Sequence, residues 1–145
     1  MTTVAATAAT YLTALEAALE ARAGLAGVRV DMTAPRDGVV GDWIVLVSDA
    51  ISEDREFVNN TRQRETTVVC RGFVEARDGT FIEAMARAGA IVDELEDEAV
   101  KHPIDVGRQT RVVNVQRVRW LPTPLEAGGY AVRGFFELAY AARIT

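Results

Sequence analysis

The segment 80–101 constrains the fold more than any other part of the chain. It opens with Thr80-Phe81-Ile82-Glu83, a capping-box pattern in which the Thr80 hydroxyl accepts from the Glu83 amide and Glu83 reaches back. Burial of the larger apolar residues that follow would contribute roughly 1.5–3 kcal/mol each, more than helix propensity offers. We therefore expect a helix that lies on a sheet. Its predicted seam has four- and three-residue spacing: Phe81, Met85, Ala88, Val92, Leu95 and Ala99.

Strand patterns occupy much of the remaining chain. The run Trp43–Val47 is apolar on both sides, which is typical of a strand inside a sheet. The last segment alternates regularly, so that Tyr130, Val132 and Phe136 face one way and Arg133 and Glu137 the other. We predict strands at 28–32, 43–47, 65–76, 110–120 and 130–144.

The order of these elements gives the fold class. A first helix is predicted over 5–23, where apolar residues form one stripe before Gly24 and Gly27. The order is therefore α-β-β-β-α-β-β, and we predict an α+β fold with two helices packed on one face of a largely antiparallel or mixed sheet. At 145 residues the chain has the length of one domain, so 1–145 is expected to be a single unit.

The polar stretch 48–64 is the first feature that exceeds what folding needs. It is interrupted only by Ile51, Phe57 and Val58. Loops of this length without structure of their own are uncommon in compact domains and are usually functional or mobile. We interpret 48–64 as an extended loop or a hairpin arm.

Charge and hydropathy exclude several classes of function. The net charge of −5 argues against a nucleic-acid binder that relies on a basic surface. No stretch approaches the roughly 20 apolar residues of a membrane helix, so no membrane partner is expected. The N-terminal residues lack the basic region of a secretory signal, which predicts an intracellular protein or part of an assembly built inside cells.

Catalytic and metal-binding patterns are weak. Cys70 is the only cysteine and lies in a strand-like run, so we expect a small buried hydrophobe. His102, the only histidine, precedes Pro103 and is expected to end a helix. The acidic run 93–98 stacks carboxylates at four-residue steps, and a solvated face is favoured over a cation site. We predict no catalytic residue, no metal and no cofactor.

Several apolar, aromatic and charged residues have no evident role in the hydrophobic core. Satellite packing would explain some of them, and an interface would explain others, because aromatic residues and Arg carry much of the energy of protein association. Basic residues gather in 55–77 and acids in 83–105, so two copies could meet basic surface to acidic surface. The candidate interface residues are Arg55, Phe57, Arg62, Arg64, Glu94, Asp97, Leu121, Leu125 and Phe135.

The element order resembles that of a known family. The likeness runs over essentially the whole chain and is carried most visibly by RVRWLP at 117–122 and GYAVRGFFEL at 129–138. In these features the chain resembles the tail terminator family of long-tailed bacteriophages, the minor tail protein U group. That family has no diagnostic short motif, so the resemblance is one of size, order and pattern.

The resemblance implies an architectural function in the virion. Family members form a hexameric ring on the end of the tail tube, stop its polymerisation and present a surface to the neck. The implied partners are further copies of the chain, the tail tube protein and the head–tail connector. Genomic DNA would pass through the lumen without specific binding. The implied location is the tail or neck of the virion, with host cytoplasm during assembly.

Two alternatives differ in their consequences. Another neck or tail-completion component of the same fold would meet a different end of the tail. A ligand-binding or enzymatic α+β domain would instead have an apolar pocket near Trp43, Trp120 and Tyr130, and would be a monomer or dimer.

Overall fold

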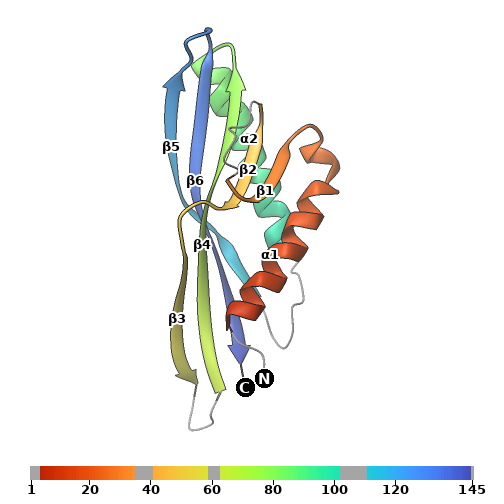
Figure 1. The fold of residues 1–145 in the computed structure, drawn as a ribbon, viewed down its shortest axis with the longest axis vertical. Coiled ribbons are helices and arrows are strands. Elements are labelled where there is room, and N and C mark those ends of the chain that lie inside the picture. The colour runs from red at the N-terminus through yellow and green to blue at the C-terminus, as the bar shows by residue number, and fades with distance from the viewer. Residues whose placement is uncertain (1–3, 35–40, 59–62, 102–110, 145) are drawn as a thin grey trace.

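The chain forms two helices and a six-stranded mixed sheet (Figure 1). The computed structural model describes residues 4–34, 41–58, 63–101 and 111–144. This arrangement confirms the predicted α+β class. The elements in chain order are α1 (Val4–Glu20), the short 3-10 helix η1 (Ala23–Leu25), β1 (Arg29–Thr33), β2 (Trp43–Val47), β3 (Ile51–Val58), β4 (Gln63–Asp78), α2 (Phe81–Lys101), β5 (Arg111–Pro124) and β6 (Tyr130–Ile144).

The sheet is mostly antiparallel. Its order is β1-β2-β4-β6-β5, and β3 pairs with β4 off this path. Only β1 and β2 run parallel, with Arg29 opposite Trp43. The other neighbours are antiparallel, including the long β4–β6 ladder from Arg64 opposite Ile144 to Asp78 opposite Tyr130. The prediction of a largely antiparallel or mixed sheet is thus confirmed.

The stretch 48–64 adds a strand that the predicted order did not contain. β3 pairs with β4 in continuous register from Ile51 opposite Cys70 to Val58 opposite Gln63. The hairpin interpretation is correct for this part, and the β3–β4 hairpin extends along the long axis beyond the helix layer (Figure 1). The sequence of 51–58 is mostly polar and does not alternate regularly, so periodicity did not reveal this strand.

Gly72 marks the place where β4 changes partner. Val45 of β2 lies opposite Phe73 of β4. In the connection from β2 to β3, the Ser48 amide donates to the Arg71 carbonyl at 2.9 Å, and the Arg71 amide donates to the Ala50 carbonyl at 3.2 Å. A Cβ on Gly72 would lie 2.2 Å from the carbonyl oxygen of Val45. The absence of a side chain therefore lets β2 leave β4 at this point.

Both helices cover one face of the sheet, as predicted (Figure 1). Their apolar sides meet the inward residues of β2, β4 and β6, and the two rings of Tyr11 and Tyr140 lie 4.5 Å apart between the layers. One continuous core results. Its most deeply buried side chains include Tyr11, Leu15, Leu19, Ile44, Leu46, Val68, Val74, Leu95, Phe136, Leu138 and Tyr140.

Helix α2 begins as its capping pattern predicts. The Glu83 amide donates to the Thr80 hydroxyl at 3.2 Å, and the Ala84 amide to the Thr80 carbonyl at 3.0 Å. The predicted burial of Phe81 is wrong: its side chain is 39% exposed and contacts Tyr130 edge-on, with ring centroids 6.2 Å apart. Phe81 is the first residue of α2 and meets Tyr130 at the start of β6, so the buried seam starts one step later. It comprises Ala84, Ala88, Ile91, Val92, Leu95 and Ala99.

Strand β5 also runs further than predicted. It continues through Pro122 and Pro124, which were expected in a connecting loop. β5 is the last strand in the sheet order, so its outer edge has no neighbour to which those residues would need to donate. The turn closes with Gly128 and Gly129, both at positive φ.

We predict that Gly72→Ala lowers the free energy of unfolding by about 1–3 kcal/mol, because the added methyl meets backbone oxygens that cannot move aside. Chemical denaturation of both variants measures this. Gly89→Ala is the matched control: its Cβ would meet nothing within 4 Å in α2, so it should stabilise by up to about 1 kcal/mol. Equal stability of the two variants would contradict the close approach.

Candidate interaction surface

The sheet face opposite the helices, here called the open face, carries a small aromatic cluster. Trp43 and Phe73 are buried and meet edge-on with centroids 5.1 Å apart, and Phe135 lies 6.1 Å from Phe73. The Trp43 indole donates to an Asp31 carboxylate oxygen at 2.8 Å. No described helix covers this face, so aromatic rings come close to the surface there.

Arginine side chains cover the cluster. The Arg133 guanidinium lies 4.0 Å from the centre of the Phe73 ring and donates to the buried carboxylate of Glu75 at 2.9 Å. Arg119 lies 5.2 Å from the centre of the Phe135 ring. Planar guanidinium groups stack favourably on aromatic rings, and these stacks shield the rings from water while leaving charge outside.

A shallow basin of about 640 Å³ lies on this cluster. Its charged lining comprises four arginines and two acids, a formal excess of two positive charges on a chain whose total is −5. Glu137 is shared by Arg71 at 3.2 Å and Arg117 at 3.5 Å. Arg119 has no carboxylate partner among the described residues. The charged residues of the basin are Arg71, Arg117, Arg119, Arg133, Asp49 and Glu137.

Arg117 reaches the basin from an unusual backbone position. Its φ of 52° is the only positive value at a non-glycine residue in the described chain. The register of β5 against β6 shifts between Gln116 and Arg119, so Arg117 sits in a bulge. Bulges redirect side chains, and strained residues of this kind cluster at functional positions. The side chain itself is 79% exposed.

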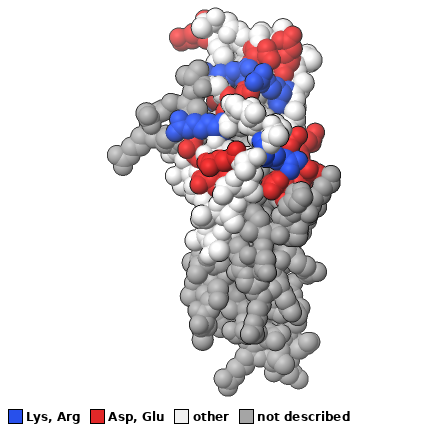
Figure 2. Space-filling model, turned by 90° about the vertical axis from the view of Figure 1, so that its right-hand side faces the viewer, with Lys and Arg blue, Asp and Glu red and all other residues white. Residues whose placement is uncertain are grey.

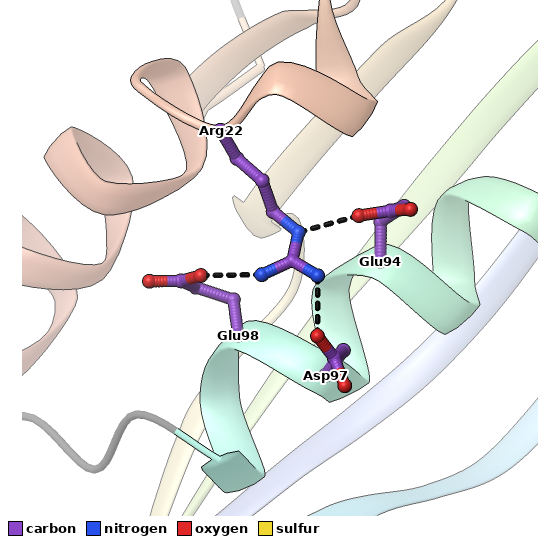
Figure 3. A network of polar contacts seen from close by, with 4 residues as sticks. All are labelled: Arg22, Glu94, Asp97 and Glu98. Carbon is purple, nitrogen blue, oxygen red and sulfur yellow. Dashed lines mark hydrogen bonds and ion pairs between the residues drawn. The ribbon is translucent and has the colours of Figure 1, made fainter.

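Three carboxylates of α2 converge on Arg22, which follows α1 (Figure 3). Arg22 Nε donates to Glu94 at 2.5 Å, a second nitrogen to Glu98 at 2.6 Å, and the third to Asp97. These hydrogen bonds raise the pKa of the Arg22 guanidinium above its ordinary value. The candidate interface residues Glu94 and Asp97 are therefore engaged within the subunit.

Acidic and basic groups are also interspersed over the surface beyond the Arg22 cluster. Figure 2 shows them interspersed over the described part of the side that carries α1 in Figure 1. Within the described part of that side, the surface is not divided into one basic and one acidic field. Sequence position alone could not reveal this, because Arg22 lies far along the chain from its acidic partners.

The other candidate interface residues are spread over the sheet. Leu121 lies on β5 and is 50% exposed, whereas Leu125 is half-buried in the turn that follows. Phe135 belongs to the aromatic cluster. Arg55 and Phe57 lie on β3 and Arg64 on β4, at positions whose side chains are not described. Arg62 falls outside the described residues, as does His102.

Neither conventional chemistry nor a common aromatic pocket emerges from the described residues. Cys70 is fully buried, as predicted, and burial raises its pKa to about 11, so the reactive thiolate is suppressed. In the described ranges no three His, Cys, Asp or Glu side chains are placed to hold a metal ion. Trp43 lies on the open face, whereas Trp120 and Tyr130 pack against the helix-side core.

No described helix has both the length and the hydropathy that a membrane span requires.

Solved structures include chains with a fold similar to this one. No family model matches the chain, and no curated protein matches it. The chain is similar to one in the solved virion of the native gene transfer agent (GTA) particle, with a TM-score of 0.55 and 20% sequence identity. The match covers 94% of this chain and 98% of that one. At this identity the likeness shows a shared fold.

We predict that Arg22→Met lowers the melting temperature, because three carboxylates would then face one another without a cation. The loss should shrink in about 1 M NaCl, which screens like charges. Arg29→Met removes a single pair from a half-exposed side chain and should shift the melting temperature less. Calorimetry at two salt concentrations measures both, and a salt-independent loss would argue against repulsion as the cause.

We predict opposite effects for glycine at two neighbouring arginines. Arg117→Gly removes a positive-φ side chain and should leave the free energy of unfolding unchanged or raise it by up to about 1 kcal/mol. Arg119→Gly places glycine in ordinary strand backbone and removes the stack on Phe135, so it should cost about 1 kcal/mol. Urea titrations compare them. Greater destabilisation by Arg117→Gly would show that Arg117 is a structural residue.

Proposed function

We propose that this chain is a non-enzymatic structural protein of a phage-like virion, and that it acts as a tail terminator. The observation that carries the proposal is the fold shared with a chain of the gene transfer agent virion, which extends over nearly all of both chains. A likeness of that extent leaves little of either chain for an unrelated domain. The buried thiol of Cys70 fits a protein without nucleophilic chemistry.

In this proposal six copies form a ring on the end of the tail tube. The ring stops polymerisation of the tube protein and offers its other surface to the head–tail connector, while genomic DNA passes through the lumen without specific binding. The protein would reside at the tail or neck of the virion and in the host cytoplasm during assembly. An acidic chain suits a conduit, since attraction to phosphate would retard DNA.

The β3–β4 hairpin supports an assembly role. It extends along the long axis beyond the helix layer, which makes it available to a neighbouring subunit (Figure 1). It carries Arg55, Phe57, Arg62 and Arg64, which we propose as contacts with neighbouring subunits. Leu121, Leu125 and Phe135 are proposed as contacts of the same kind. Glu94 and Asp97 are proposed as well, and they would contribute while paired with Arg22.

A second candidate is another neck or tail-completion component with the same fold. The fold likeness favours it equally, because the relative is known here only as a chain of the gene transfer agent virion, at an unspecified place in the particle. The two candidates differ in the partner bound: a terminator binds the tail tube, and a neck component binds the connector without capping tubes.

We predict that the purified chain forms six-fold rings, alone or on tubes of the tail tube protein from the same virus. Sedimentation velocity across concentration and negative-stain images measure this. A control variant replaces 55–66 by Asn-Gly, which joins the paired residues Asp54 and Thr67 by a tight turn. It should keep a cooperative melt and lose ring formation. A chain that stays monomeric with tube and connector proteins would refute the proposal.

A further inference from the structure

We infer that the basin on the open face binds the outer side of α2 from the next copy, through Arg117 and Arg119 on one subunit and Asp93 and Glu96 on the other. This inference rests on the proposed ring and names a contact that would build it. It differs from the contacts proposed above, because these two arginines come from β5 and none of the four residues is in the hairpin.

The basin has the features of a receiving surface. Arg119 is exposed and has no carboxylate partner among the described residues, and Arg117 shares Glu137 only at 3.5 Å. Beneath them Phe135 and Phe73 provide an aromatic floor. Interfaces concentrate their binding energy in such Arg and aromatic residues when a partner excludes water from them. The strained backbone of Arg117 is of the kind that clusters at functional positions.

Charge balance points to another copy as the occupant. The basin carries a formal charge of +2 within a chain of −5, so the remaining residues together carry −7. A basic site on an otherwise acidic subunit is complementary to the rest of the same subunit. A second copy is therefore attracted to the basin, and wrong orientations that bring acid to acid are disfavoured.

Helix α2 presents the matching acids. Arg22 forms ion pairs with three acids of α2, Glu94, Asp97 and Glu98. Asp93 and Glu96 are exposed and have no partner within the described part of the chain. They stand three residues apart, which places them on one side of the helix about 5–6 Å apart. Exposed or half-exposed small residues precede them and would let a neighbouring surface approach closely: Ala86, Gly89 and Ala90.

Arg117 and Arg119 both line the basin, and their long side chains can span the about 5–6 Å between Asp93 and Glu96 on the helix. Two long guanidinium groups can therefore meet two carboxylates at once. Such pairing is directional and strong when partly desolvated.

The two surfaces lie in different layers of the molecule. The basin is on the open face of the sheet, and α2 belongs to the helix layer on the opposite face (Figure 1). A contact between different surfaces is heterologous, so each copy leaves one surface of each kind free for the next. Repetition of this contact closes into a ring when the rotation per copy divides a full turn.

A charge-swap experiment on the full chain tests the contact. Arg119→Glu and Asp93→Arg are made singly and together, and a mismatched pair joins Arg119→Glu with Glu126→Arg in the exposed turn after β5. Both double variants keep the wild-type net charge. Sedimentation velocity, alone and with the tail tube protein of the same virus, measures the dissociation constant of assembly, and thermal melts check folding.

We expect each single reversal to weaken assembly about ten-fold or more. The swapped pair should recover most of the loss, and the mismatched pair should not. If wild type assembles and the single reversals have no effect, this contact is wrong while the ring stands. If wild type never assembles, the proposed function fails and the contact fails with it. A folded single variant that assembles normally but loses binding to a labelled DNA duplex would make the basin a nucleic-acid surface and overturn the inference.

Discussion

The antiparallel ladder between β4 and β6 is the interaction on which the rest of the structure depends. It runs without interruption over fifteen residue pairs, and every other strand except β1 attaches to one of its two members. One face of the ladder supplies the floor for both helices, and the other supplies the aromatic rings and arginines of the basin. Core and interaction surface are thus two sides of the same strands, held in register by main-chain hydrogen bonds.

Much of this frame could be predicted because it leaves periodic signals. The seam of α2 and the alternation from Tyr130 onward identified the helix layer, and Trp43–Val47 was correctly placed inside the sheet. Strand β3 was missed because its sequence is mostly polar and shows no regular alternation. Phe81 was misplaced because periodicity gives the side of a helix that faces the sheet and not how far neighbouring side chains cover its first residue.

The candidate surface was predicted only in fragments. Phe135 was singled out as an aromatic residue on the mixed face, but its companions Phe73 and Trp43 were assigned to strands without a shared role. The basin joins residues from β4, β5 and β6 through register, and the pairing of Arg22 with α2 spans 72 residues of sequence. Interactions of that range depend on topology. A single sequence specifies topology weakly, and the positive φ of Arg117 has no local signature such as glycine.

The outer edge of β5 affects how readily the folded chain pairs with strands of other chains. It is the longest edge of the sheet, yet Pro122 and Pro124 remove two donors from it and the bulge at Arg117 bends the strand. An unprotected edge of that length would recruit strands from any nearby chain and lead to uncontrolled fibres. The two prolines and the bulge therefore make this edge a poor template for pairing with a strand of another chain.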